Sequence, residues 1–220
     1  MHTISIASIK GGVGKTTLSL LVAAEMALEG YKVALLDCDL NQHAVAFGEK
    51  SSIPNLTVIG AVDENNVLKH LQAAQKDHDL AIIDLPGVSS TLALKAFQRS
   101  DVVLIPSQVS LPDVRDAFRT NAQVDDAQEL RGSPIARSLV WTRIPAGFES
   151  RAARHVRETV DGTDVPIMRS SLFDRAIFRE IHITGRVPRQ TDPTGNSAEN
   201  VYAVTQEILA LIPDAAEAIS

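Results

Sequence analysis

The sequence predicts an α/β fold in a single domain, built on a mostly parallel, twisted sheet with helices on both faces. Runs of aliphatic and β-branched residues alternate along the chain with segments whose apolar residues recur at helical spacing. The runs "VALLD", "LAIID" and "VVLIP" are apolar throughout, which is typical of parallel strands buried on both sides. A length of 220 residues is enough for one well-buried domain and short for two.

The expected elements alternate strictly along the chain. Strands are predicted at 3–8, 32–37, 80–84, 102–106 and 136–142, with a short one at 165–168. Helices are predicted at 16–28, 67–76, 92–99, 114–129, 151–160 and 197–211. The segment 185–196 is rich in Gly, Pro, Thr and Asn and is expected to be a loop. We place one domain at residues 1–212 and a short acidic tail at 213–220.

Composition and charge argue against several classes of protein. The formal net charge of −6 does not indicate a general polyanion binder. Cys38 is the single cysteine, which excludes a disulfide framework, a zinc cage and an iron–sulfur cluster and fits a reducing cytosol. Neither a signal peptide nor an apolar run of membrane-spanning length is recognisable, so we expect a cytoplasmic protein without a membrane partner.

A glycine-rich segment between the first strand and the first helix has the composition of a phosphate-binding loop. It reads K-G-G-V-G-K-T-T and consists of Lys10, Gly11, Gly12, Val13, Gly14, Lys15, Thr16 and Thr17. Glycines let successive backbone N–H groups approach phosphate oxygens, and the helix N-terminus adds partial positive charge. Lys15 is expected to reach the β- and γ-phosphates of ATP, Thr16 to ligate Mg²⁺, and Thr17 to hold the α-phosphate.

Carboxylates end two of the expected strands. Asp37 and Asp39 follow one apolar run, and Asp84 follows another. Because ligands of open α/β sheets bind at the carboxyl ends of strands, these groups are candidates to hold Mg²⁺ or to orient an attacking water. Helix capping after a strand is the structural alternative.

The lysine at position 10 makes the loop resemble that of the deviant Walker A ATPases, the ParA/MinD superfamily, whose fold is that of P-loop NTPases. In that family the first lysine reaches the partner's phosphates across a nucleotide-sandwich dimer. The resemblance therefore implies that Lys10 acts in trans and that ATP binding and homodimer formation are coupled. A second cation that arrives only on dimerisation would neutralise charge at the transferring phosphoryl group.

The same resemblance assigns roles to the strand-end residues. Asp39 is expected to position the hydrolytic water, Asp37 to support the first switch region and lie near Mg²⁺, and Asp84 to organise Mg²⁺. Gly87, in the second switch, is expected to approach the γ-phosphate. The family pattern D-x-D-P-Q is not fully kept, because Leu40 stands in place of the proline and the glutamine is displaced to position 42.

The adenine pocket is less defined by the sequence. Arg143 follows a late strand, where the base-binding loop of the family begins, and we assign it to nucleotide binding, although a solvated arginine fits as well. The loop 185–196 is a second candidate for a wall of the adenine pocket. The segment "FDRAI" at 173–177 resembles one in the VirC1-like and small ParA branch.

The second half of the chain is rich in arginine. Residues 131–190 hold eleven arginines against six acidic residues. Non-specific duplex DNA is the expected partner of this region, and the assigned residues are Arg151, Arg154, Arg157, Arg169, Arg175 and Arg179. Three-residue spacing places the first three on one predicted helical face. An ordinary solvated face with internal ion pairs is the alternative.

These features favour a small ParA-type ATPase that segregates DNA or positions a protein cargo on the nucleoid, with weak intrinsic hydrolysis stimulated by a cargo adaptor protein. The acidic C-terminal end lacks the basic amphipathic helix expected of a membrane-bound MinD-type protein. Three alternatives stay open: a MinD-like positioning ATPase without DNA binding, a metabolic enzyme of the dethiobiotin-synthetase type, and a regulator with a degraded switch. The cargo, whether plasmid, chromosome or protein assembly, is not encoded in any recognisable motif.

Overall fold

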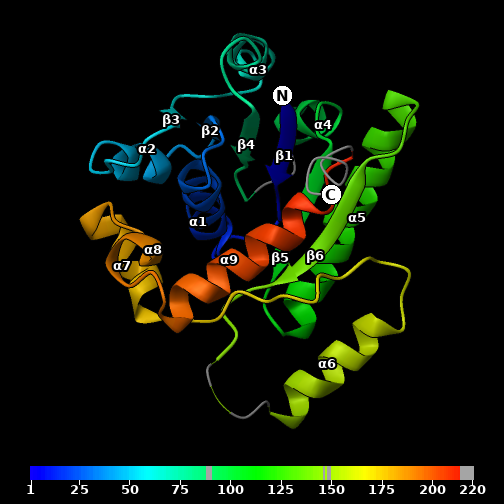
Figure 1. The fold of residues 1–220 in the computed structure, drawn as a ribbon. Helices are drawn as coiled ribbons and strands as arrows, with labels where there is room; N and C mark the ends of the chain where they lie inside the picture. Colours follow the sequence, from blue (N-terminus) through cyan, green and yellow to red (C-terminus); the bar gives the residue numbers. More distant parts are fainter. Residues whose placement is uncertain (88–90, 146, 148–149, 214–220) are drawn as a thin grey trace.

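The computed structural model describes all residues except 88–90, 146, 148–149 and 214–220 (Figure 1). Within this part the strands form one sheet in the order β3-β2-β4-β1-β5-β6, and every ladder is parallel. The strands are β1 (His2–Ile6), β2 (Val33–Asp37), β3 (Leu56–Ile59), β4 (Leu80–Asp84), β5 (Val102–Ser107) and β6 (Ala136–Trp141). The predicted α/β fold with a parallel sheet is confirmed.

Helices cover both faces of this sheet (Figure 1). They are α1 (Lys15–Leu28), α2 (His43–Gly48), α3 (Val67–Ala74), α4 (Thr91–Phe97), α5 (Leu111–Arg131), α6 (Arg151–Asp161), α7 (Ala176–Thr184), α8 (Pro188–Thr191) and α9 (Asn196–Leu209). One apolar core joins the sheet to α1, α2, α7 and α9, and a second joins it to α3, α4, α5 and α6.

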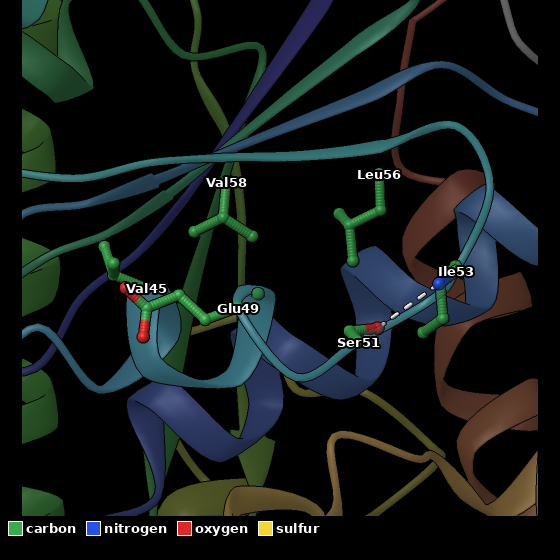
Figure 2. Close-up of a pocket in the computed structure, with 7 residues that line it drawn as sticks. Val45, Glu49, Ser51, Ile53, Leu56 and Val58 are labelled. Carbon is green, nitrogen blue, oxygen red and sulfur yellow. Dashed lines mark hydrogen bonds between the residues drawn. The ribbon is translucent and has the colours of Figure 1, made fainter.

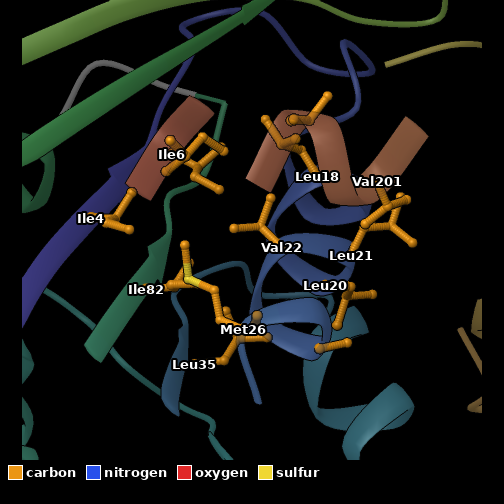
Figure 3. Packing of buried hydrophobic residues seen from close by; sticks show 14 of the residues in the cluster. Ile4, Ile6, Leu18, Leu20, Leu21, Val22, Met26, Leu35, Ile82 and Val201 are labelled. Atoms are coloured by element: carbon orange, nitrogen blue, oxygen red, sulfur yellow. The ribbon is translucent and has the colours of Figure 1, made fainter. Parts of the chain in front are cut away.

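Alternate residues of each central strand enter different cores. Ile82 faces the first core and Ile83 the second, and both are fully buried. Figure 3 shows Ile82 on the α1 side of the sheet, near Val22 and Met26 of that helix. Burial on both faces explains why these strands are apolar at every position rather than at every second one.

Four elements were not predicted, and two segments differ from their prediction. The unpredicted elements are α2, β3, α7 and α8; β3 is a four-residue, partly exposed edge strand, which leaves little periodic signal. The short strand expected at 165–168 is not a sheet strand, because the only bridge in it joins Leu139 to Ile167. Within the expected loop 185–196, residues 188–191 form α8. The predicted acidic tail lies outside the described residues, apart from Pro213.

The register of the sheet brings the predicted site together. Asp37 at the end of β2 is paired with Asp84 at the end of β4, and Asp84 is paired with Ile6 at the end of β1. Residues 10–17 follow β1 directly, so the phosphate loop and the carboxylates share the carboxyl edge of the sheet.

Candidate nucleotide-binding site

The phosphate loop connects β1 to α1 and contains two glycines in a left-handed conformation. Gly12 has a φ of 78°, and Gly14, the N-cap of α1, has a φ of 96°. Side chains other than glycine rarely adopt these angles, so the sequence requirement at both positions follows from the backbone. Gly14 leads directly into the first turn of α1, whose free N–H groups face the expected phosphate position.

Lys15 is held across the mouth of this loop. Its Nζ donates a hydrogen bond to the carbonyl of Lys10 at 3.0 Å, and the side chain is largely buried. Burial lowers the pKa of Lys15, while the carboxylates of Asp84 and Asp39 oppose that shift. A lysine ammonium that is largely removed from solvent is suited to binding phosphate oxygens.

Two side chains from other strands fix the loop, and neither was anticipated from the sequence. The hydroxyl of Thr142, after β6, donates a hydrogen bond to the carbonyl of Val13 at 2.6 Å. The amide of Gln108, after β5, donates one to the carbonyl of Gly12 at 3.3 Å. Their position at the carboxyl ends of strands was the available signal, but their partners lie about a hundred residues away along the chain.

Asp84 has the properties of a group that organises a cation. It is 1 % exposed, its Oδ1 accepts a hydrogen bond from Ser19 at 3.0 Å, and its Oδ2 is buried without a hydrogen-bond partner. Burial raises the pKa of Asp84 to about 7, although hydrogen bonds from Thr16 and Ser19 act against the shift. An unpartnered carboxylate oxygen beside the Thr16 hydroxyl fits the oxygen ligands that Mg²⁺ prefers. Bound Mg²⁺ would supply charge neutralisation at the phosphates.

Asp37 supports the loop after β2. Its Oδ1 accepts a hydrogen bond from the Asp39 N–H at 3.1 Å, and its Oδ2 accepts from Ala44 and Val45 at 2.8 and 3.1 Å. Both oxygens are therefore used in shaping the loop and starting α2. Support of the first switch by Asp37 and its direct ligation of Mg²⁺ both stay predictions.

Asp39 lies in the same loop and is partly exposed. Its Oδ1 accepts hydrogen bonds from both the backbone N–H and the side-chain amide of Asn41, at 2.9 and 2.8 Å. Leu40, in place of the family's proline, is 98 % exposed. The expected role of Asp39 in positioning water stays a prediction.

Lys10 is paired within its own chain. Its Nζ lies 2.6 Å from Oδ1 of Asp113, whose side chain is only 5 % exposed. Asp113 also contacts Ser110, the N-cap of α5. The lysine expected to act on a partner protomer therefore has an alternative, intramolecular position, and its action in trans stays a prediction.

Gly87 approaches the phosphate loop closely. A Cβ at this position would lie 3.1 Å from Lys15 Nζ and 3.2 Å from the Gly11 backbone nitrogen. Only glycine leaves this space open for a phosphoryl group. The next residues of the second switch, 88–90, lie outside the described residues.

A cavity of about 100 Å³ lies beside the loop on the side of α7. Its lining includes Gly14, Thr17, Arg143, Phe173, Arg175 and Arg179. Arg143 thus lies beside the phosphate loop, together with residues between 172 and 179. The role of Arg143 in nucleotide binding and that of the loop 185–196 as a wall of the adenine pocket stay predictions. Arg175 and Arg179, assigned to DNA from the sequence, lie here; Arg179 pairs with Asp174 at 2.7 Å, and Arg175 lies over the Phe173 ring.

The arginines of α6 differ in their exposure. Arg151 and Arg154 are exposed, but the Arg157 guanidinium is half-buried and lies 5.2 Å from the centre of the Trp141 ring. Arg157 is less exposed than Arg151 and Arg154 because its guanidinium packs against Trp141 of β6. Contact of these arginines with DNA stays a prediction. Arg169 is exposed near α9.

A second hollow, of about 270 Å³, lies between α2 and the edge strand β3 (Figure 2). Val45, Ile53, Leu56 and Val58 supply its apolar walls. No residue predicted for the nucleotide site lines this hollow.

Several known proteins are similar to this chain in sequence. A family model described as VirC1 protein matches residues 1–211. "Protein ParA" of Rhizobium radiobacter is 26% identical over 220 residues, covering 98% of this chain and 99% of the relative. "Maintenance of carboxysome distribution protein A" of Halothiobacillus neapolitanus is 26% identical over 212 residues, covering 94% and 96%.

A solved structure shows the same fold. Apo McdA of Cyanothece superposes with a TM-score of 0.80 at 17% identity, covering 94% of this chain and 99% of that one. The deviant phosphate loop, the parallel sheet and the match over nearly the whole chain agree with one another. The chain therefore belongs to the VirC1 family, within the ParA/MinD superfamily of P-loop ATPases.

Proposed function

We propose that this chain is a ParA-like ATPase that binds ATP with Mg²⁺, dimerises on ATP and hydrolyses it slowly to segregate DNA or to position a protein cargo. The observation that carries this proposal is the buried, unpartnered oxygen of Asp84 beside Thr16, at the mouth of a loop that contains two lysines. An ATP complex of McdA of Cyanothece has the same fold, with a TM-score of 0.76 at 18% identity.

Non-specific DNA is the proposed matrix. Arg151 and Arg154 project from α6, within a region that has eleven arginines against six acidic residues. Two copies of this surface in an ATP dimer would double the number of phosphate contacts, which favours binding by the dimer over the monomer. We place the protein on the nucleoid in the cytoplasm. Among the described residues, no helix is both long and apolar enough to span a bilayer.

A cargo adaptor is the remaining proposed partner. Outside residues 131–190 the chain carries a net negative charge, which suits an adaptor with a basic segment. Slow hydrolysis alone and faster hydrolysis with DNA and adaptor are expected, since the stimulating contacts would complete the site only in the assembly.

The test is binding to non-specific duplex DNA with ATP, with ADP and without nucleotide, at two salt concentrations. We expect tight binding with ATP alone, retained in Asp39→Ala and weakened in Lys10→Ala. Replacing both Arg151 and Arg154 by Ala removes up to four phosphate contacts from a dimer, so the slope of log K against log salt should become shallower by up to about 4.

A matched control is Arg99→Ala, since Arg99 is exposed but precedes β5 at the opposite edge of the sheet. Hydrolysis without DNA binding at low salt would remove DNA from the proposal and favour a MinD-like positioning ATPase. Turnover that requires a small-molecule acceptor would favour a metabolic enzyme of the dethiobiotin-synthetase type.

A further inference from the structure

The loop that holds Asp39 is attached to the turn after β3 by the side chain of Gln42. The Gln42 amide nitrogen donates a hydrogen bond to the Asp39 carbonyl at 2.6 Å. The Gln42 Oε1 accepts one from the backbone N–H of Ala61 at 2.8 Å. One carboxamide therefore bridges two loops, and both ends of the amide are used.

The backbone of Gln42 takes an uncommon conformation to make this bridge. Its φ of 51° and ψ of 41° lie in the left-handed region, which residues with a Cβ occupy at a cost of about 1 kcal/mol or more. The Gln42 backbone N–H also donates to the Asp39 carbonyl, at 3.0 Å. The same carbonyl thus receives two hydrogen bonds from one residue, which holds the backbone of Asp39 in place.

The receiving turn is shaped for this side chain. A Cβ on Gly60 would overlap both the Gln42 Oε1 and a methyl group of Val45. Gly60 lies immediately before Ala61, whose N–H is the donor, so the absence of a side chain lets the carboxamide reach that donor. The Gln42 carboxamide therefore connects the Asp39 loop to the turn that follows the edge strand β3.

We infer that Gln42 is a positioning residue for Asp39 in ATP hydrolysis. Asn41 fixes the carboxylate of Asp39 through its two hydrogen bonds, and Gln42 fixes the backbone that carries it. This assignment rests on the proposed ATPase function. It also gives the displaced glutamine of the D-x-D-L-N-Q segment a defined task in this chain.

Gln42→Glu tests the assignment with little change in shape. The carboxylate still accepts the Ala61 N–H but cannot donate to the Asp39 carbonyl, and it places negative charge against that oxygen. We expect kcat to fall by about 10- to 100-fold, because small displacements of a reacting group cost rates of this order. The KM for ATP should stay unchanged, because the phosphate loop is not altered.

Gln72→Glu is the matched control, since Gln72 is an exposed glutamine on α3. A second variant, Gln42→Asn, keeps the amide and tolerates the left-handed backbone but is too short to bridge both loops, and it should show the same loss of kcat. Thermal unfolding of each variant establishes that it is folded.

The possible outcomes distinguish a failure of the Gln42 assignment from a failure of the proposed ATPase function. A lower kcat with unchanged KM in either folded variant supports the assignment. Wild-type kcat in both, or a loss confined to KM, overturns it while leaving the ATPase proposal intact. A wild-type protein that hydrolyses no ATP, with Mg²⁺ and DNA present, overturns the proposed function and this assignment together.

Discussion

The Lys10–Asp113 ion pair makes a quantitative prediction about dimerisation. If Lys10 crosses to a partner's phosphates, it must first leave Asp113, from which it is separated by 2.6 Å. Asp113 is nearly buried, but the Lys10 side chain is 37 % exposed, so the pair is partly screened. A partly screened ion pair contributes about 1 kcal/mol at the upper end of its range, or about 2 kcal/mol for two protomers. Asp113→Asn should therefore tighten the ATP-dependent dimer by roughly 30-fold.

Sedimentation velocity with a non-hydrolysable ATP analogue, over a range of protein concentrations, measures this dissociation constant. The control is Asp116→Asn on the same helix, because Asp116 forms a surface pair with Arg119 and should leave the dimer unchanged. Adding Lys10→Ala to Asp113→Asn should abolish the gain, since no lysine is left to release. An unchanged or weaker dimer in folded Asp113→Asn would refute the reasoning.

Three further predictions concern the site. Gly87→Ala should weaken ATP binding by about tenfold or more without lowering the unfolding temperature, measured by calorimetry, because its Cβ would lie 3.1 Å from Lys15 Nζ. Because burial raises the pKa of Asp84 from 3.8 to about 7, that group's stabilising contribution is complete below pH 3.8 and is lost as the pH rises from there to about 7. The unfolding free energy of the nucleotide-free protein should fall over that range, and Asp84→Asn should flatten the profile; an equal slope in both proteins contradicts this. Thr142→Val should cost about 1 kcal/mol of stability and reduce ATP affinity, since the Val13 carbonyl loses its donor; denaturant titration with and without ATP tests it.

Local features made much of the fold and site predictable. Strands buried on both faces are apolar at every residue, so β2, β4 and β5 are recognisable without long-range information. The phosphate loop is contiguous, and Gly12 and Gly14 are required by backbone angles within the segment itself. Asp84 is recognisable because it ends an apolar run.

Other features depend on residues that are distant along the chain. Arg175 and Arg179 look like part of a basic surface in the sequence, but the path of the chain after β6 brings them beside Gly14. Arg157 looks equivalent to Arg154, but Trp141 attracts its guanidinium to β6. Neither placement leaves a local pattern, because it depends on which elements pack together.

The amino-acid sequence alone determined the alternation of strands and helices, the phosphate loop and the identity of its carboxylates, because each depends on neighbours within a few residues. The tertiary structure decided which side chains restrain that machinery: Asp113 on Lys10, Thr142 on Val13, and Gln42 between Asp39 and Ala61. These contacts are set by the strand order β3-β2-β4-β1-β5-β6, which arises from the pairing and burial of whole elements rather than from any local run of residues.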